Sequence, residues 1–544
     1  MSANDIFSLK RPENEPILSY EPGSEEKIEL KEKLKELKSN PVEIPLIING
    51  KEVKTGNVKE IRAPHNHDLV LGKYHMAGEK EINQAISASL EAKKEWENTS
   101  WEKRAAIFLK AASLLAGPRR AELNAATMLG QSKNVFQAEI DSACELIDFL
   151  RFNAYFMTEI YQNQPSSTED ILNRMEYRPL EGFIFAVPPF NFTSIGANLP
   201  TAPALMGNTA LWKPASTAVY SNYFFMKLLM RAGLPDGVIN FIPGKGSEIG
   251  PMVLNRPELA GIHFTGSVNT LDTLYKEVGQ NIDKYDTYPR IVGETGGKDF
   301  IFAHESADKG ELVTALIRGA FQYQGQKCSA ASRSYIPEEL WSEIKEELVN
   351  KVENIKMGPV DDFTNFVNAV IDESAFDKIS GYIDYAKKAD DAEVIAGGEY
   401  DKTDGYYIRP TIIVTTDPKF KSMEEEIFGP VLTIYIYDSA DFEETLQVCD
   451  QTSPYGLTGS IFAKDRSAVK TAEKVLKHAA GNFYINDKPT GAVVGQQPFG
   501  GARKSGTNDK AGSQWNLMRW VSPRSIKENL NPPVNYQYPF MKEE

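Results

Sequence analysis

Short apolar runs alternate with helical segments over much of the chain. Between residues 182 and 296 the runs GFIFAV, TALW, VINF and GIHF are each followed by a segment of helical character. Apolar runs of this length are typical of buried strands. A second alternating region extends from about residue 298 to 483. This rhythm predicts parallel sheets with crossover helices, and two α/β domains are the simplest arrangement.

The segments outside these regions follow other patterns. The run IPLIINGKEV predicts a strand that turns at Asn49-Gly50, and apolar residues three and four positions apart predict helices from Glu79 to about Tyr161. The polar stretch QNQPSSTEDILNRMEYRPLE interrupts this periodicity. We therefore divide the chain into an N-terminal arm with helices (1–161), a polar excursion (162–181), a first sheet region (182–296), a second sheet region (297–505) and a C-terminal segment (506–544).

Composition and charge exclude several classes of protein. The chain has 544 residues, 41% of them hydrophobic and 25% charged, which are ordinary values for a multidomain globular protein. Its net charge of −15 argues against a nucleic-acid partner, which needs a basic face. No apolar run approaches the roughly 20 residues that span a membrane. The acidic N-terminus is unlike a transit peptide, so we expect a cytoplasmic protein, or a mitochondrial matrix protein if a transit peptide was removed.

Three cysteines are present, and one of them is a candidate nucleophile. Cys144, Cys328 and Cys449 are too few and too far apart for a disulfide framework or a metal site. Cys144 and Cys449 fall in predicted helices and are interpreted as packing residues. Cys328 lies among small residues in GQKCSAASR, where a substrate can approach the sulfur, although a lone cysteine is more often a buried hydrophobe. An inward-pointing Lys327 would lower the pKa of this thiol.

A cysteine nucleophile needs a base, and Glu294 is the better candidate for that role. The six histidines lie in no recognisable protease context, so a thiol protease is a weak alternative. Glu294 lies in VGETGGKDF, where glycines leave room beside the carboxylate. It precedes Cys328 by 34 positions. A glutamate beside glycines is often only a turn residue, so the combination of motifs must decide whether Glu294 is a base.

Seven motifs in order resemble the aldehyde dehydrogenase superfamily: PPFNFT, LWKPAS, FTGS, VGETGGKDF, GQKCSAASR, EEEIFGPVL and PFGGARKSG. The resemblance extends from about Leu46 to Trp520. It implies an α/β fold with a Rossmann-type NAD-binding domain (182–296 and the preceding helices), an α/β catalytic domain (297–505) and a β-hairpin oligomerisation element (162–181), with the C-terminal segment (506–544) contributing to oligomerisation. It also implies a homodimer, which larger assemblies could contain.

The resemblance assigns the chemistry to three residues. By similarity, Cys328 attacks an aldehyde, and the resulting oxyanion expels a hydride to a nicotinamide ring. The side chain of Asn191 and the backbone N–H of Cys328 would hold this oxyanion. Glu294 would then activate the water that hydrolyses the thioester. For Asn191 alone, a turn after two prolines is the simpler interpretation.

The cofactor contacts also follow from the resemblance, because no G-x-G-x-x-G follows a strand here. By similarity, Gly266 and Ser267 would meet the pyrophosphate near a helix N-terminus, where anions are favoured. Lys213 matches the residue that holds the adenosine ribose. Glu426 and Phe428 match the contacts to the nicotinamide ribose and ring.

The choice between NAD and NADP depends on residue 216. Many NAD-preferring members carry an acidic residue three positions after the lysine, where this chain has Ser216. A serine does not repel a 2′-phosphate. NAD is therefore the favoured cofactor, and NADP remains open.

The substrate-facing motifs, including PTGAVVGQQPFGGARKSGTNDKAG, resemble the branch of the superfamily that oxidises L-glutamate γ-semialdehyde to L-glutamate in proline degradation. This branch implies a hydroxyl and two backbone N–H groups for the α-carboxylate, two aromatic rings for the aliphatic stem, and an acid for the ammonium. The residues in these roles would be Ser329, Gly491, Ala492, Phe192, Phe499 and Glu145. A solvated helix face explains Glu145 about as well.

Two other functions stay open from the sequence. One is oxidation of another small acidic semialdehyde, such as succinate semialdehyde, and the other is a non-catalytic protein that keeps the fold. A CoA-acylating relative is less favoured, because Glu294 is present to activate water.

Overall fold

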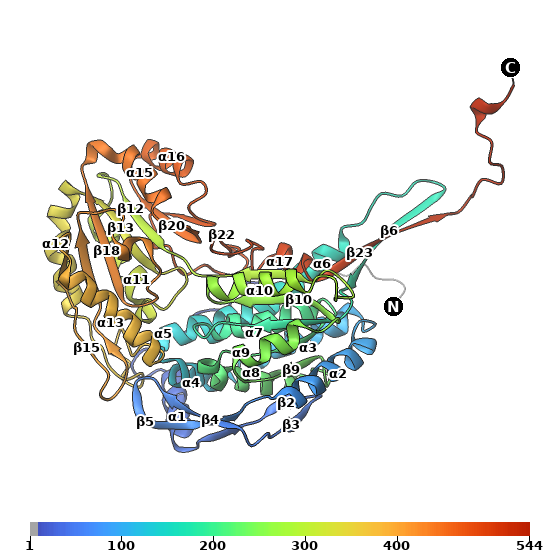
Figure 1. Ribbon diagram of the computed structural model, residues 1–544, viewed down its shortest axis with the longest axis horizontal. Helices are drawn as coiled ribbons and strands as arrows, with labels where there is room; N and C mark the ends of the chain where they lie inside the picture. The colour runs from blue at the N-terminus through green and yellow to red at the C-terminus, as the bar shows by residue number, and fades with distance from the viewer. Residues whose placement is uncertain (1–8, 544) are drawn as a thin grey trace.

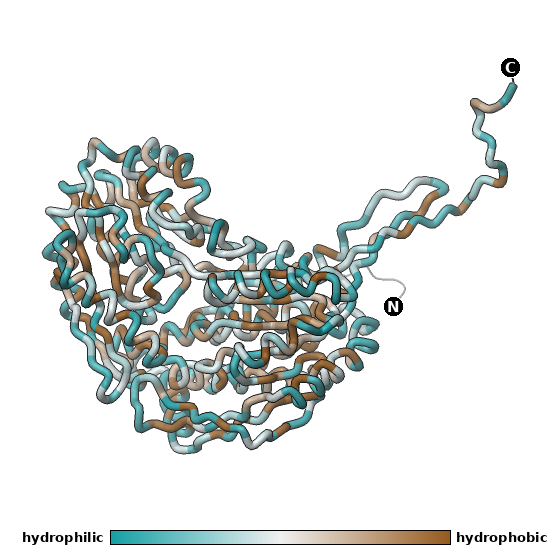
Figure 2. Tube along the Cα trace, viewed as in Figure 1, coloured by the Kyte–Doolittle hydropathy of each residue, from teal (hydrophilic) through white to brown (hydrophobic). Residues whose placement is uncertain are grey.

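The computed structural model describes residues 9–543, so the first eight residues of the predicted N-terminal region and Glu544 lie outside it. Two α/β bodies lie side by side, and a thin two-stranded ribbon projects from one of them (Figure 1). Hydrophobic positions concentrate on the inner strands of both bodies (Figure 2). No helix within the described residues is long and apolar enough to cross a membrane.

The first body is built on a seven-stranded sheet of order β11-β10-β7-β8-β9-β2-β3. Five neighbouring strands are parallel, as the alternating pattern predicts: β7 (Phe183–Val187), β8 (Thr209–Trp212), β9 (Ile239–Phe241), β10 (Leu259–Thr265) and β11 (Arg290–Glu294). At the edge, β2 (Leu46–Ile48) and β3 (Lys51–Val53) pair antiparallel around the Asn49-Gly50 turn. The parallel sheet confirms the α/β class.

Helices cover both faces of the first sheet, because its strands are apolar on both sides. Phe183 and Phe185 pack on one face and Ile184 on the other, as alternation along a strand requires. One face is covered by α2 (Glu79–Trp96), α9 (Gly246–Leu254) and α10 (Val268–Gln280). The other is covered by α3 (Trp101–Ala116), α4 (Arg120–Gln131), α6 (Leu146–Gln162), α7 (Thr193–Leu205) and α8 (Val219–Ala232).

A smaller layer precedes these helices in the chain. It consists of α1 (Glu25–Ser39) and a three-stranded sheet of order β1-β5-β4, with β1 (Val42–Ile44), β4 (Val58–Ala63) and β5 (Asn66–His75). Between α4 and α6 the chain forms a short helix, α5 (Val135–Ala138), and one stretch of π-helix, η1 (Glu139–Glu145). Single π-turns of this kind are frequent at functional sites.

The second body has a seven-stranded sheet of order β14-β17-β18-β13-β12-β20-β21. Its strands are β12 (Asp299–Ala303), β13 (Ala331–Pro337), β14 (Ala392–Ala396), β17 (Thr411–Thr415), β18 (Val431–Tyr437), β20 (Thr458–Phe462) and β21 (Asn482–Ile485). Only β14 is antiparallel to its neighbour. One face packs on α11 (Lys309–Phe321) and α12 (Glu338–Glu353), and the other on α13 (Glu373–Lys388), α15 (Phe442–Gln451) and α16 (Arg466–Val475).

The projecting ribbon pairs β6 (Ile171–Pro179) with β23 (Val521–Asn529) in one antiparallel register, from Pro179 opposite Val521 to Ile171 opposite Asn529. The polar excursion thus supplies one strand and the C-terminal segment supplies the other, so residues 162–181 do not form the expected hairpin by themselves. Just before β23, the side chain of Trp520 is buried in the core of the first body beside His263. The chain beyond β23 runs outward (Figure 1). Aromatic side chains in this segment, such as Phe540, are exposed.

Candidate active site

The candidate nucleophile lies in a constrained loop between α11 and β13. Tyr323, Gln324 and Gly325 all have positive φ, of 52°, 54° and 65°. Two of them carry side chains, a conformation that persists only when the surroundings hold it. Here the buried Gln324 amide donates to the carbonyls of Ser132 and Ala369, at 3.0 and 2.7 Å. The loop therefore presents Cys328, which is partly buried, in a fixed place.

Asn191 joins this loop to the first sheet. It follows β7, its side chain is 3% exposed, and its Nδ2 donates a 3.1 Å hydrogen bond to the carbonyl of Gln326. The amide thus lies beside the backbone that leads into Cys328. The second N–H of this amide takes no part in that hydrogen bond and can donate to an oxygen atom bound at Cys328.

Three carboxyl groups face Cys328: Glu294 at the end of β11, Asp299 at the start of β12, and Glu426 before β18. Burial, and then the charges of these groups, raise the pKa of the Cys328 thiol well above its usual value. The net shift is thus opposite to the lowering expected from Lys327. Lys327 is itself buried, and desolvation lowers the pKa of its ammonium to about 7.

Glu294 connects the nucleophile to the late PFGGARKSG motif. Its Oε2 accepts a 3.3 Å hydrogen bond from the Gly501 backbone N–H, and its backbone carbonyl accepts one of 3.0 Å from Gly266. Burial raises the pKa of the Glu294 carboxyl well above its ordinary value, against the lowering influence of Gly501 and the nearby Lys510. A carboxyl with a raised pKa can exchange a proton near neutral pH, as a general base must.

A cleft of about 520 Å³ opens between the two bodies beside these groups. On one side it is lined by Ser267 and the first turn of α10, where Ser267 is the N-cap and accepts from the Thr270 backbone N–H at 3.2 Å. On the other side lie Glu426 and Lys378. A helix N-terminus at a cleft is a ready site for a phosphate group.

Glu426 lines the far wall of this cleft, and Phe428 follows two residues later in the chain. The Glu426 carboxylate accepts a 3.0 Å hydrogen bond from the Gly297 backbone N–H, and burial raises its pKa. A Cβ on Gly297 would collide with the carbonyl of Cys328, so only glycine allows this close approach. Phe428 has φ of 63° and meets Phe190 edge-on at 5.8 Å between ring centroids.

Lys213 and Ser216 lie farther along the carboxyl ends of the same parallel strands, after β8. Lys213 is 8% exposed, and its Nζ would be 3.7 Å from a Cβ at Gly246, the first residue of α9. Within residues 9–543 this ammonium has no hydrogen-bond or ion-pair partner, and burial lowers its pKa to about 8. Ser216 is half-buried and begins a short turn before α8. The carboxyl edge of a parallel sheet is where such folds bind ligands.

The residues expected at the far end of a substrate come from three separate segments. Ser329 is buried next to Cys328, and Gly491 has φ of 96°, which favours glycine. Ala492 follows it in the same loop. Phe192 lies under the Lys133 ammonium, at 4.2 Å from its ring centroid, and Phe499 is held by two backbone hydrogen bonds to Ala511.

A group of lysines lies near the residues expected to bind the far end of the substrate, and the sequence did not predict it. The Lys488 Nζ would be 3.3 Å from a Cβ at Gly491. Lys488 and Lys133 both lie close enough to Lys327 to lower its pKa. The only sequence signal is the polar turn NDKPTG. These cations make the region favourable for an anion.

Glu145 lies at the end of η1 and is not on a solvated helix face. Burial, together with the charge of Asp141, raises the pKa of its carboxyl to about 8, and its Oε2 accepts a 2.5 Å hydrogen bond from the Ser194 hydroxyl. Asp141, also in η1, accepts from the backbone N–H groups of Thr193 and Ser194 at 3.0 and 2.9 Å. The π-helix thus caps the start of α7, immediately after Asn191 and Phe192. Periodicity could not reveal this, because it predicted a regular helix.

Comparison with known proteins agrees with this geometry. The model of the aldehyde dehydrogenase family matches residues 52–526. The chain belongs to the aldehyde dehydrogenase family.

Individual relatives in this aldehyde dehydrogenase family are similar over nearly their whole length. Mitochondrial Δ1-pyrroline-5-carboxylate dehydrogenase of Dictyostelium discoideum is 54% identical over 98% of this chain and 96% of its own. The human mitochondrial enzyme of the same name is 48% identical over 97% and 94%. A crystal structure of the Mycobacterium tuberculosis Δ-pyrroline-5-carboxylate dehydrogenase bound with NAD superposes with a TM-score of 0.96, at 49% identity and full coverage of both chains.

Proposed function

We propose that this protein oxidises L-glutamate γ-semialdehyde, the open form of Δ1-pyrroline-5-carboxylate, to L-glutamate with NAD⁺. The observation that carries the proposal is the position of Cys328. It follows the peptide that accepts from the Asn191 amide, the Glu294 carboxyl is near enough to influence its pKa, and Ser329 is the next residue. The names of the relatives support the substrate.

The roles of the residues follow from the geometry of the site. Cys328 Sγ forms the bond to the aldehyde carbon once its proton has left, and the facing carboxyl groups are acceptors for that proton. The Asn191 amide and the Cys328 N–H stabilise the oxyanion. Glu294 then takes a proton from the water that attacks the thioester, which releases the acid and restores the thiol.

The cofactor in this proposal is NAD, which accepts the hydride when bound. Its fit rests on two features of the chain. The buried ammonium of Lys213, which has no partner within residues 9–543, suits the hydroxyls of a ribose, and the α10 N-terminus at Ser267 suits a pyrophosphate. Glu426 lines the same cleft and is an acceptor for a second ribose. Ser216 leaves NADP as a weaker alternative.

Recognition of the substrate rests on groups that bind a carboxylate. The Ser329 hydroxyl and the N–H groups of Gly491 and Ala492 would hold the α-carboxylate, with Lys488 beside them. The rings of Phe192 and Phe499 would flank the stem. Glu145 is the acid available for the α-ammonium group.

A second candidate is the oxidation of a semialdehyde without the amino group, such as succinate semialdehyde. Lys488 and Lys327 favour it as much as they favour glutamate semialdehyde, because both substrates carry a distal carboxylate. The test is kcat/KM for glutamate semialdehyde, succinate semialdehyde and propanal on the purified protein. We expect kcat/KM to be highest for glutamate semialdehyde, lower for succinate semialdehyde and lowest for propanal. A higher value for succinate semialdehyde would favour the alternative, and equal values would contradict both.

We propose that the protein is a homodimer held together by the ribbon. Larger rings would be built from such dimers. An isolated two-stranded ribbon is marginally stable in water. The β6–β23 ribbon projects from the first body and has mostly exposed or half-exposed side chains on both faces. A second copy that packs on it would supply the missing contacts. The domain boundaries given above, and a cytoplasmic or mitochondrial location, belong to the same proposal.

A further inference from the structure

The N-terminal arm, defined here as residues 9–20, lies across the first body before α1 begins. It has no regular secondary structure, yet its contacts are with segments more than 100 positions away in the chain. Extended segments of this kind stay in place only when their polar groups find partners. The partners of this arm fall into two groups, on the helical segments α4, η1 and α6 and on the loop after Ala492.

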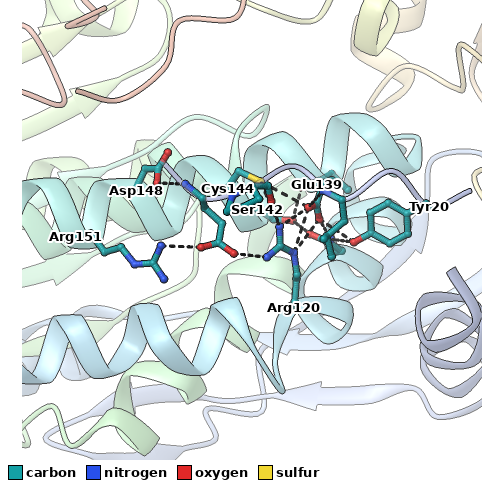
Figure 3. A network of polar contacts seen from close by, with 12 residues as sticks. Tyr20, Arg120, Glu139, Ser142, Cys144, Asp148 and Arg151 are labelled. Atoms are coloured by element: carbon teal, nitrogen blue, oxygen red, sulfur yellow. Dashed lines mark hydrogen bonds and ion pairs between the residues drawn. The ribbon is translucent and has the colours of Figure 1, made fainter. Parts of the chain in front are cut away.

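An ion-pair network fixes the middle of the arm to the helices (Figure 3). Glu15 accepts from Arg120 at 2.5 Å and from Arg151 at 2.6 Å, and its backbone N–H donates to Asp148 at 2.8 Å. Arg120 also pairs with the fully buried Glu139 of η1. Buried charges joined in this way are costly to separate, because removing one partner leaves the other unpaired.

The end of the arm is held by the same buried carboxylate. Glu139 accepts from the Leu18 backbone N–H at 2.9 Å and from the Tyr20 hydroxyl at 2.8 Å. Glu139 begins the π-helix that carries Asp141 and Glu145. The arm is therefore attached to the segment that caps α7 beside Asn191 and Phe192.

The start of the arm contacts the loop that follows Ala492. Asn14 Nδ2 donates to the Asp148 carboxylate at 2.7 Å and to the Val494 carbonyl at 2.8 Å, and Asn14 Oδ1 accepts from Gln496 at 2.8 Å. Arg11 donates to the Gly495 carbonyl at 3.0 Å. One asparagine side chain thus joins α6 to a turn that begins directly after Ala492.

The opposite side of this turn rests on α6. Val494 packs with Phe149 and Phe152 in a small hydrophobic cluster. Gly495 has φ of 80°, and a Cβ there would collide with the Phe152 ring. The turn at residues 493–497, closed by the Val493 N–H on Gln497 Oε1 at 2.9 Å, is therefore held between α6 and the arm.

We propose that the N-terminal arm is a positioning strap for the substrate-carboxylate loop, residues 491–497, and that Asn14 is its main positioning residue. The strap rests on the proposed function, because it acts on the loop whose Gly491 and Ala492 N–H groups would bind the α-carboxylate. Its contribution is to recognition of acidic substrates. We expect the reaction at Cys328 to be independent of the Asn14 contacts, since the hydrogen bonds of Asn14 reach Asp148, Val494 and Gln496 and none of these residues is in the nucleophile loop.

The test replaces Asn14 and compares an acidic with an uncharged aldehyde. Asn14→Ala removes the bonds to α6 and to the loop together. We expect KM for glutamate semialdehyde to rise about tenfold, equivalent to about 1.4 kcal/mol, with kcat and the KM for propanal unchanged. The inhibition constant of L-glutamate should rise in parallel. Ser19→Ala, on an exposed residue of the same arm, is the matched control and should behave as wild type.

Hydrogen–deuterium exchange provides a readout that does not depend on the substrate. Amides of residues 491–497 should exchange faster in Asn14→Ala than in Ser19→Ala, while the strands of both sheets stay protected. Unchanged exchange in this loop, or an equal rise of KM for both aldehydes, would contradict the proposed positioning role of the arm. Failure of the wild type to prefer glutamate semialdehyde would instead overturn the proposed function. If Asn14→Ala does not fold, Gln496→Ala on the exposed side of the contact gives a weaker effect in the same direction.

Discussion

The Asn191 side-chain amide donates its 3.1 Å hydrogen bond to the Gln326 carbonyl, across the boundary between the two bodies. This bond fixes the amide relative to the peptide that precedes Cys328. A donor fixed before the reaction costs no reorganisation when the oxyanion forms. The proposed oxyanion site would thus be assembled from both bodies, and its geometry would depend on how they are held together.

Asn191→Ala should lower kcat by about 10²–10³, the usual effect of losing one oxyanion donor. The KM for the aldehyde should change little, because the ground-state carbonyl carries less charge than the oxyanion. Steady-state kinetics measures both values. A large rise in KM with unchanged kcat would place Asn191 in substrate binding.

Cys328→Ala should abolish dehydrogenase activity and leave NAD affinity nearly unchanged, because Sγ forms the covalent bond and the cofactor groups lie elsewhere. Calorimetric titration with NAD and an NADH absorbance assay check the two halves of this prediction. Cys449→Ala, at a buried cysteine in α15, is the matched control and should remain active. Substantial turnover without Cys328 would remove the thiol from the mechanism.

Glu294→Gln should give a rapid burst of NADH followed by slow turnover, because hydride release precedes the hydrolysis that needs a base. The Glu294 pKa is raised, so in the wild type the deprotonated base appears only as pH rises through that raised value. Steady-state activity of the wild type should therefore increase with pH over that range. The increase should be lost in Glu294→Gln. Stopped-flow absorbance at several pH values measures both effects, and a missing burst would contradict this role.

Ser329→Ala should raise KM for glutamate semialdehyde by about ten- to a hundredfold, since a hydrogen bond to a charged group contributes roughly 1.5–3 kcal/mol. Propanal lacks the carboxylate and should be affected much less. Steady-state assays of both aldehydes decide the point. Equal losses on the two would mean that the substitution disturbs Cys328 itself.

Deleting residues 163–175 should convert a dimer into a monomer, because the deletion removes five of the nine residues of β6, Ile171 to Met175, and with them the partners of Ser525 to Asn529 in β23. Light scattering of the wild type and the deletion measures the masses. Arg174→Ala, which loses only an exposed ion pair with Glu528, should remain dimeric. A monomeric wild type, or a fully dimeric deletion, would refute the proposed interface.

The periodic parts of the fold could be predicted from the sequence. Runs such as GFIFAV are apolar on both faces because helices cover both sides of a parallel sheet. The strand after Cys328 and the Asn49-Gly50 turn also follow from local signals. The π-helix at η1 does not, because its spacing of apolar residues resembles that of an ordinary helix.

Sequence motifs lead to some of the candidate site residues, whereas residues that depend on tertiary packing carry no such signal. Cys328, Glu294 and Glu426 stand in recognisable motifs, and the structure brings them together. Lys488 and the pair Lys133–Asp141, at 2.6 Å, stand in no motif. Their contribution comes from burial, which local sequence does not encode. The raised pKa of the Cys328 thiol escaped prediction for the same reason.

Trp520 is encoded after the second body but completes the core of the first. During synthesis the ribosome must add residues 297–505 before this side chain emerges, which takes on the order of 10–40 s at about 5–20 residues per second. For that interval the first sheet has a gap beside His263 where the indole will pack. A nascent chain of this protein therefore presents an apolar surface to chaperones until translation is almost finished. A premature stop codon after residue 505 would leave that gap permanently open, although both sheets would be present.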